Sequence, residues 1–185
     1  AETMSSPWKE LTTDSHVYFL TGPLSQWHPS DFTAALPISR KVFRFNCCEQ
    51  YMMASKADLF GDDAALEKIM AVQPVEGRPF RDVPDAQKKL GRTVKNFDQA
   101  MWSVRDEEIV FQGNLAKFTQ NHDLQAYLIG TGSRHLVEGA SYDPIWGVGL
   151  AWNDPAIQDE QNWKGLNKLG KVAMRVRAHV IEHRL

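Results

Sequence analysis

The chain has 185 residues, with 21 basic and 23 acidic side chains and a formal net charge of -2. This length suits a chain that buries a real hydrophobic core, so we expect one domain rather than two small ones. A charge this close to neutral argues against a broad nucleic-acid or membrane surface, although it allows a small local phosphate site.

The cysteines and the start of the chain bear on its compartment. Cys47 and Cys48 are adjacent, and sequence neighbours rarely meet disulfide geometry, so we expect buried, reduced thiols in an intracellular, cytoplasmic protein. No run of about 18 apolar residues predicts a membrane span, and residues 1–10 lack the pattern of an export signal. We take residues 1–16 as an N-terminal extension and 17–185 as the domain.

The strand signals are few and short. Residues 17–20, 42–45 and 136–137 are predicted as strands, and residues 145–150 as a further one. Residues 21–39 and 74–84 are punctuated by proline and glycine and are predicted as loops.

The helical signals are stronger. We predict helices over 49–60, which stops at Gly61, over 62–72, which Asp62 caps, and from Pro84 to residue 90. Residues 97–121 predict a long helix with a weak point at Gly113, 124–129 a short one, and 166–181 an amphipathic one. The expected fold class is therefore α+β, a helix-rich single domain with a small embedded β-sheet.

The stretch EQYMMASKA raises the first question about function. Its spacing places Glu49 and Lys56 on one helix face, with Met52 and Met53 between them. Two turns rise about 10 Å, which is too far for an easy ion pair but lets both groups reach one ligand. Alternatively, Glu49 only caps the helix N-terminus, where the helix dipole stabilises its carboxylate, and Lys56 extends past the methionines into water.

Two further segments carry groups that bind bases or phosphates. The loop with Ser25, Gln26, Trp27 and His28 combines a hydroxyl, an amide, an indole and an imidazole. The alternative is a turn in which the indole covers the edge of the core. Trp102, flanked by polar residues, suits either stacking on a heteroaromatic ring or structural packing.

The stretch SYDPIWGVGL places Asp143 before the last predicted strand and Trp146, Gly147 and Gly149 inside it. Glycines within a strand often mark a close approach of a ligand to the backbone. An Asp-Pro turn leading into an ordinary strand explains the same residues.

Several common chemistries find no motif in this sequence. The Walker and GxGxxG phosphate loops, the GxSxG elbow and the HExxH zinc motif are all absent. The six histidines show no metal-ligand spacing with the cysteines. We therefore expect neither a bound metal nor a cofactor.

Taken together, the blocks LSQWHPSDF, EQYMMASKA, LGRTVKNFD, AKFTQN, LVEGASYDPIWGVGL and WKGLNKLGKVAMRVR resemble, in order, the NADAR superfamily, which includes the YbiA-like N-glycosidases. The resemblance covers residues 17–180. It implies a single α+β domain that hydrolyses the bond between ribose C1 and a base nitrogen. Relatives are associated with two substrate classes, guanine bases that carry ADP-ribose and phosphoribosyl-pyrimidine intermediates of riboflavin biosynthesis.

The resemblance also assigns residues. It implies that the key carboxylate is Glu49, the basic residue of the first motif Lys56, the tryptophan Trp102 and the aspartate Asp143, all gathered around the anomeric carbon. Carboxylates stabilise the oxocarbenium-like sugar that forms when a base leaves. A lysine of lowered pKa could instead capture the C1 aldehyde of an opened ribose as a Schiff base.

Weaker assignments follow from the same resemblance. Gly91 with Arg92, and Lys117 with Gln120, become candidate binders of phosphate or ribose. The implied partner is ADP-ribose or an ADP-ribosylated nucleobase, and removal of ADP-ribose from guanine is the favoured function. The alternatives are the riboflavin-intermediate glycosidase and a non-catalytic ADP-ribose reader.

Overall fold

The computed structural model describes residues 6–185, which form two compact units. One unit is continuous, from Pro29 to Asn121, and the other combines residues 6–28 with the C-terminal part from His122. The fold class is α+β, as predicted, but the strands form two small sheets rather than one.

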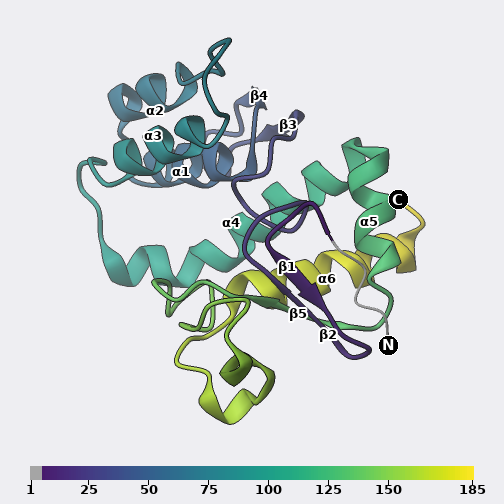
Figure 1. The fold of residues 1–185 in the computed structure, drawn as a ribbon. Helices are drawn as coiled ribbons and strands as arrows, with labels where there is room; N and C mark the ends of the chain where they lie inside the picture. The colour runs from purple at the N-terminus through teal and green to yellow at the C-terminus, as the bar shows by residue number, and fades with distance from the viewer. Residues whose placement is uncertain (1–5) are drawn as a thin grey trace. The chain divides into compact units, whose positions relative to one another are not determined.

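The continuous unit is built around α1 (Cys48–Leu59), which packs against α2 (Asp63–Met70), α3 (Asp82–Gly91) and α4 (Gln99–Gln120) (Figure 1). A hairpin of β3 (Phe32–Ala35) and β4 (Val42–Phe45) precedes α1. Phe32 and Phe45 pair across this hairpin and stack, with their ring centroids 5.6 Å apart. The hairpin thereby gives the helices an aromatic edge.

Helix α4 continues without a break through Gly113, the predicted weak point. A Cβ atom at Gly113 would lie 2.6 Å from the ring of Tyr51. The glycine therefore lets α4 approach α1 closely, and this packing offsets the loss of helix propensity that glycine causes.

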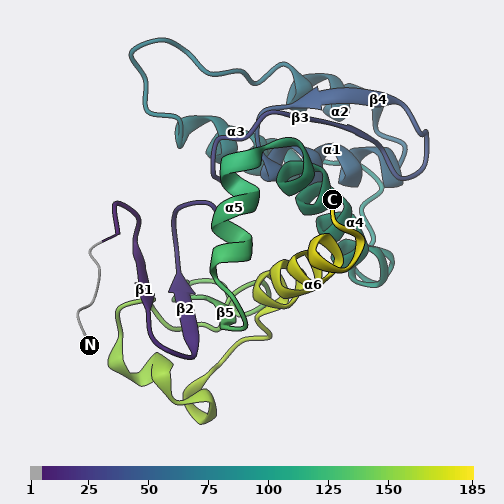
Figure 2. The same ribbon diagram turned by 90° about the vertical axis from the view of Figure 1, so that its right-hand side faces the viewer.

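The other unit has a three-stranded sheet in the order β1 (Glu10–Thr12), β2 (His16–Phe19), β5 (His135–Glu138), with β2 and β5 parallel (Figure 2). Helix α6 (Lys168–His183) packs on β5, and α5 (His122–Gly130) contacts α6. The predicted N-terminal extension thus contributes β1, which pairs with β2. The boundary at residue 16 itself stays a prediction.

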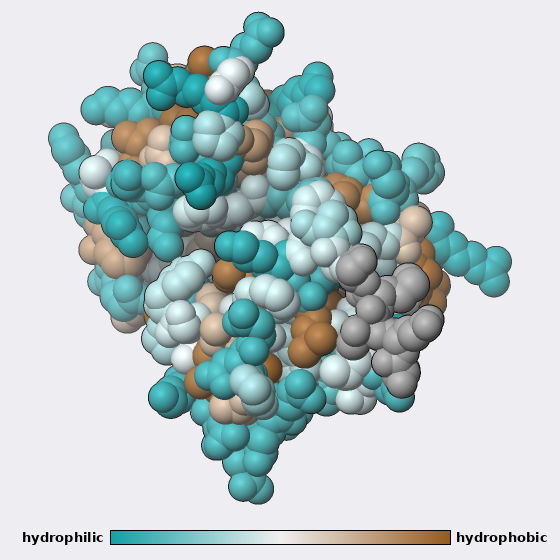
Figure 3. Space-filling view, viewed as in Figure 1, coloured by the Kyte–Doolittle hydropathy of each residue, from teal (hydrophilic) through white to brown (hydrophobic). Residues whose placement is uncertain are grey.

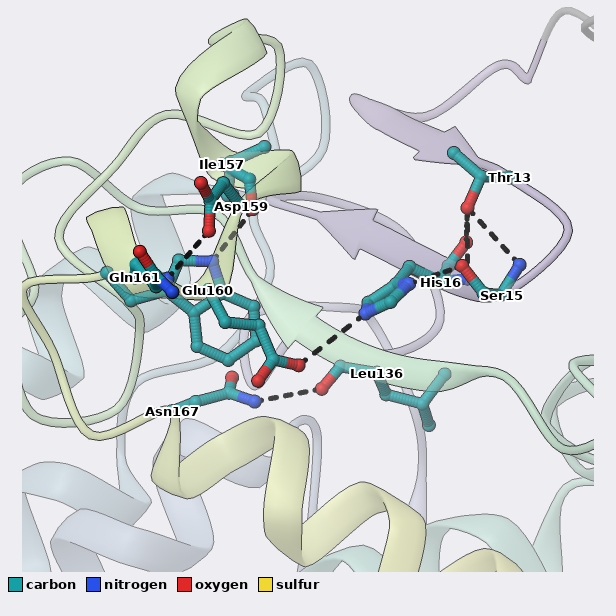
Figure 4. Close-up of polar contacts among 10 residues, drawn as sticks. Thr13, Ser15, His16, Leu136, Ile157, Asp159, Glu160, Gln161 and Asn167 are labelled. Atoms are coloured by element: carbon teal, nitrogen blue, oxygen red, sulfur yellow. Dashed lines mark hydrogen bonds and ion pairs between the residues drawn. The ribbon is translucent and has the colours of Figure 1, made fainter.

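Two short 3-10 helices, η1 (Pro155–Gln158) and η2 (Glu160–Asn162), cover part of this sheet. Figure 4 shows Glu160 reaching His16 of β2, with 3.8 Å between the carboxylate and Nε2. The Trp163 indole donates to the Ile157 carbonyl at 2.7 Å. Asn167 donates to the Leu136 carbonyl, so side chains join this loop region to the sheet.

Most predicted elements agree with the structure, including all the helices. The strand predicted over residues 145–150 is wrong, because this segment forms turns and bends. Asp143 accepts backbone amides there and Gly149 has a φ of 73°, which no strand residue adopts. The short strands β1 and β3 were not predicted, and β3 lies within the predicted loop over residues 21–39.

One face of the molecule is mainly polar. Figure 3 shows hydrophilic residues over most of the visible face, with hydrophobic residues in small separate patches. Within residues 6–185, no helix is long and apolar enough to cross a membrane.

Candidate active site

Glu49 and Lys56 occupy one face of α1, as their spacing predicts. Met52, Met53 and Glu49 are buried, whereas Lys56 is partly exposed. Cys47, the N-cap residue of α1, makes no side-chain capping bond, and Glu49 lies in the first turn. The helix dipole favours a carboxylate at that position, but dipole stabilisation alone does not require its burial.

The Lys56 amine lies against aromatic rings rather than extending freely into water. Its Nζ is 4.4 Å from the ring centroid of Phe97 and 5.8 Å from that of Trp102. Cations are attracted to the faces of aromatic rings within about 6 Å. Phe97 also packs edge-on against Phe60 at the end of α1, at 5.3 Å. Lys56, Phe97 and Trp102 thus form one cluster, which we call the lysine–aromatic cluster.

The start of α4 explains why both rings lie near Lys56. Asp98 caps α4 by accepting the Met101 amide at 3.0 Å. Phe97 therefore precedes the cap and Trp102 is the fourth helical residue, which are the two positions of a hydrophobic staple. Sequence reasoning singled out Trp102 and missed Phe97 as a site residue, although the staple spacing was a signal that could have found it.

The loop before α4 is fixed by a second aspartate. Asp62 caps α2 through the Ala65 amide and also accepts the Lys95 amide at 2.9 Å. These two hydrogen bonds lower the pKa of Asp62, so its carboxylate is ionised and holds the loop at neutral pH. The aromatic part of the cluster is therefore tied to α2 as well as to α4.

The electrostatics of Lys56 are unusual for a lysine. Burial lowers the pKa of its amine, the Glu49 carboxylate raises it, and the Arg92 guanidinium lowers it again. The net effect is a lowered pKa, so a larger fraction of the amine is neutral at a given pH. A neutral amine is the nucleophilic form, which is the state that covalent chemistry on a carbonyl carbon needs.

The weaker candidates in the same unit make different kinds of contact. Arg92 follows the end of α3 and influences Lys56. Gly91 allows close packing, because a Cβ atom there would be 2.0 Å from Met53 Sδ. Gln120 bonds both the amide and the carbonyl of Thr33, each at 2.8 Å. Its amide therefore joins α4 to β3, which is a structural role.

Lys117 is fully buried, and burial lowers the pKa of its amine. Its Nζ lies 4.9 Å from the ring centroid of Phe118. Burial also raises the pKa of the neighbouring Cys48 thiol, to about 11, although Lys117 opposes this. Both cysteines are free and buried, as predicted. Phosphate binding by Lys117 stays a prediction.

The loop of residues 25–28 belongs to the other unit. The Ser25 hydroxyl accepts the Trp27 amide at 3.1 Å, and the His28 amide donates to the Ser25 carbonyl at 3.2 Å. Ser25 and Gln26 are buried, and the His28 ring meets Trp8 edge-on at 5.2 Å. The serine therefore shapes a turn, and ligand binding by these four residues stays a prediction.

Asp143 and its neighbours also lie in that unit. Asp143 Oδ1 accepts the amides of Ile145 at 3.0 Å and Trp146 at 2.9 Å. Lys168 Nζ lies 5.0 Å from the Trp146 ring centroid. Gly147 is buried, and a Cβ atom there would be 3.0 Å from the Asp143 carbonyl oxygen. The turn reading of Asp143 is thus supported, and a reactive role for it stays a prediction.

The continuous unit therefore brings together Glu49, Lys56, Trp102 and Arg92, four of the residues predicted from sequence, and adds Phe97. The gathering of Asp143 with them stays a prediction. Within residues 6–185, no group of three or more histidine, cysteine, aspartate or glutamate side chains is arranged to hold a metal ion.

Comparison with known proteins gives the family. A sequence model described as the NADAR domain matches residues 16–181. The chain belongs to the NADAR family. It is 37% identical over 175 residues to N-glycosidase R617 of Acanthamoeba polyphaga mimivirus, which spans 90% of this chain and 97% of that protein.

Two further relatives match over shorter stretches of the chain. Protein irg-1 of Caenorhabditis elegans is 35% identical over 164 residues, covering 83% of this chain and 73% of that protein. N-glycosidase YbiA of Escherichia coli is 28% identical over 144 residues, covering 78% and 76% of the two chains. The NMR structure of E. coli YbiA matches 95% of this chain and 90% of its own with a TM-score of 0.68 at 23% identity, which supports the fold.

Proposed function

We propose that this NADAR protein is an N-glycoside hydrolase that cleaves the bond between ribose C1 and a base nitrogen. The observation that carries the proposal is the lysine–aromatic cluster. In it the Lys56 amine has a lowered pKa and interacts electrostatically with the buried Glu49 carboxylate. Relatives over most of the chain length are named N-glycosidases, which supports the same reaction class.

Lys56 acts as the nucleophile in the proposed reaction. The substrate ribose first opens, so that C1 forms an imine with the exocyclic nitrogen of the base. The neutral Lys56 amine adds to C1, and the bond from C1 to the base nitrogen breaks. That nitrogen takes the two protons that the lysine amine gives up, which leaves an imine between C1 and Nζ. Water then adds to C1, the bond from C1 to Nζ breaks, and the phosphorylated sugar leaves with a C1 aldehyde, which regenerates the Lys56 amine.

Glu49 and the aromatic rings have complementary roles in this proposal. The Glu49 carboxylate stabilises positive charge that develops at C1 and transfers protons between the amine, water and the leaving base. Trp102 and Phe97 keep water from the amine and offer faces on which the base or sugar stacks. Arg92 supplies donors for a substrate phosphate. Asp143 is proposed as a second reactive carboxylate.

The proposed substrate is a guanine base that carries ADP-ribose, as a free nucleoside or in nucleic acid, so that the enzyme reverses this modification. Transfer of C1 from an exocyclic nitrogen to a lysine amine exchanges one amine for another, which suits a base modified on an exocyclic amino group. Free ADP-ribose is the expected product.

The proposal is tested by supplying the purified protein with ADP-ribosylated guanosine and, separately, with a phosphoribosyl-pyrimidine, and measuring the released bases by mass spectrometry. Lys56→Arg keeps a charge but loses the nucleophile, so kcat/KM should fall on the order of 10³-fold. Lys89→Arg is the matched control, because Lys89 is exposed and pairs with Asp85 at 2.8 Å.

Borohydride reduction separates the covalent route from other mechanisms. With substrate present, the wild-type protein should gain one reduced ADP-ribose adduct located on Lys56, and Lys56→Arg should gain none. Rapid turnover with no adduct on the wild-type protein would overturn the covalent step. Absence of base release from both substrates would overturn the proposed function itself.

A further inference from the structure

The continuous unit also contains a cavity of about 590 Å³ between the β3–β4 hairpin and α4. We call it the hairpin cavity. It is lined by Thr33 and Arg40 from the hairpin, Tyr51 from α1, and Arg105, Gln112 and Thr119 from α4, among others. None of the residues proposed above for the reaction lines it. Its volume falls in the range of small-molecule sites, which is about 300–1,000 Å³.

Helix periodicity shows how this cavity lies relative to the lysine–aromatic cluster. Along α4, Arg105, Gln112 and Thr119 recur every seven residues and so form one stripe that lines the cavity. Gly113, the residue after Gln112, lies outside this stripe and faces the Tyr51 ring. Tyr51 follows Glu49 by two residues, which places it on nearly the opposite side of α1. On α1 the cavity and the lysine–aromatic cluster therefore use different faces, whereas on α4 Trp102 lies one turn before Arg105, at the start of the helix.

The loop that carries Arg40 is held in a defined and strained conformation. Asp58 of α1 accepts the backbone amides of Ile38 at 2.7 Å and Ser39 at 3.1 Å. The Leu36 amide donates to the Lys41 carbonyl at 2.9 Å, which closes the loop. Arg40 has a φ of 61°, a left-handed conformation that is rare for a residue other than glycine, asparagine or aspartate.

A strained arginine at the wall of a cavity invites a functional explanation, because a glycine would meet the same backbone requirement without strain. Among residues 6–185, the guanidinium groups of Arg40 and Arg105 make neither an ion pair nor a hydrogen bond. Arg40 lies close enough to the Tyr51 phenol to lower its pKa, against the larger effect of burial. Both arginines are thus available to a ligand.

The other polar groups add selectivity. Thr33, Gln112 and Thr119 offer neutral hydrogen-bonding groups, and Glu108 also lines the cavity, where it accepts the Gln112 amide at 3.0 Å. A carboxylate beside two guanidiniums disfavours a ligand that is only an anion, and it favours one that also carries hydrogen-bond donors. A nucleotide has both, since its phosphate suits arginine and its ribose and base supply donors.

We propose that the hairpin cavity is a second binding site, for the phosphate and ribose of a nucleotide, with Arg40 and Arg105 holding the phosphate. The ligand is either a free nucleotide or one nucleotide unit of a strand, because both present the same chemistry. This inference does not depend on the proposed glycosidase activity.

The test maps binding onto the full-length protein by NMR. The alanine methyl groups of Ala34 and Ala116 line the cavity and report on it, while the Trp102 indole reports on the lysine–aromatic cluster. The probes are AMP, inorganic phosphate and an unmodified single-stranded oligonucleotide. We expect AMP to shift both methyl signals at millimolar concentration or below, and inorganic phosphate to bind at least tenfold more weakly.

Substitutions test whether Arg40 and Arg105 are responsible for AMP binding. Arg40→Gly removes the guanidinium and relieves the left-handed strain, so its melting temperature should be no lower than that of the wild type while its AMP affinity falls at least tenfold. Arg105→Gln should cause a similar loss. Arg44→Gln is the control, because Arg44 lies outside the cavity and pairs with Asp31 at 3.3 Å.

The outcomes are distinct. Methyl shifts with AMP that Arg40→Gly abolishes support a free nucleotide, and shifts with the oligonucleotide alone support a strand. Absence of methyl shifts with every probe, or AMP affinity unchanged in both arginine variants, overturns the proposal. Lys56→Arg should leave this binding intact, so failure of the glycosidase proposal and failure of the second site are read from different experiments.

Discussion

The two units differ in where they place their charged side chains. In the unit that contains the sheet β1-β2-β5, Asp143 and Asp154 are partly buried and Asp159 is exposed, and all three accept backbone amides of irregular segments. The buried Asn167 bonds the backbone of β5. In the continuous unit, Glu49 and Lys117 are buried on helices. A helix interior already pairs its own backbone groups, so it needs no such help.

This difference teaches where to look for chemistry. A polar side chain that satisfies loop backbone has a structural reason to be buried, whereas a charge buried on a helix carries a desolvation cost that its own backbone does not explain. Titratable groups perturbed in this way are enriched at functional sites. The comparison therefore ranks Glu49 and Lys56 above Asp143 as reactive groups, and substitutions in both units can break that ranking.

The largest expected effect is on turnover. Glu49→Gln keeps the side-chain volume and removes the charge, so kcat should fall by about 10²- to 10⁴-fold, the usual range for a positioned acid or base. The free energy of unfolding should stay the same or rise, because a buried carboxylate is lost. Steady-state kinetics and urea denaturation measure the two quantities.

Glu67→Gln is the control for this substitution, because Glu67 is exposed on α2. It should leave both turnover and stability unchanged. If Glu49→Gln instead destabilised the protein with little loss of turnover, Glu49 would be a structural residue and the ranking of the two units would be wrong.

A pair of glycine substitutions contrasts the rigidity of the two units. A Cβ atom at Gly139 would lie 2.4 Å from the Trp152 Cα, so Gly139→Ala must displace backbone. We expect it to lower the free energy of unfolding by about 3 kcal/mol. Gly91→Ala meets the flexible Met53 side chain instead and should cost about 1 kcal/mol. Equal costs in urea denaturation would contradict this reading.

Asp143 tests the comparison most directly. Asp143→Ala removes the acceptor of two backbone amides and should cost about 1–2 kcal/mol of unfolding free energy. Asp143→Asn keeps a carbonyl oxygen and should retain most of that stability. Normal turnover in the asparagine variant would limit Asp143 to the turn, whereas a stable variant without turnover would establish the second reactive carboxylate.

The sequence predicts the helices well because their signals are local. Asp62 caps α2 through its own side chain, and the apolar periodicity of α6 matches the face that it buries. The segment at residues 145–150 forms no strand although it is apolar, because Val148 and Leu150 are buried in a backbone set by Asp143 and Gly149. Strand β3 depends on its partner β4, and periodicity alone does not reveal such pairing.

The candidate site could be predicted only in part for a similar reason. Glu49 and Lys56 share a helix face, and their relation follows from spacing alone. The approach of Phe97 and Trp102 to Lys56 requires α4 to pack on α1, which Gly113 and Tyr51 permit. The strain at Arg40 arises from bonds between its loop and Asp58, and no short sequence window contains both partners.

The smallest expected effect concerns acid sensitivity in the unit that contains β5. Burial lowers the pKa of His135, the neighbouring His16 lowers it further, Glu160 raises it, and Arg177 and Lys171 lower it. Its ring also faces Trp163 at a centroid distance of 6.0 Å. A base whose pKa is lowered on folding binds its proton more readily in the unfolded chain.

The stability that His135 provides is therefore fully present above its unfolded pKa of about 6.5 and declines as the pH falls below that value. Urea denaturation at pH 7.5, 6.0 and 5.0 should show a smaller decline for His135→Gln than for the wild type. His122→Gln is the control, since His122 is exposed at the start of α5, and it should keep the wild-type decline. A decline that His135→Gln leaves unchanged would assign the acid sensitivity to other groups, and the burial of His135 would then have no measurable cost at acid pH.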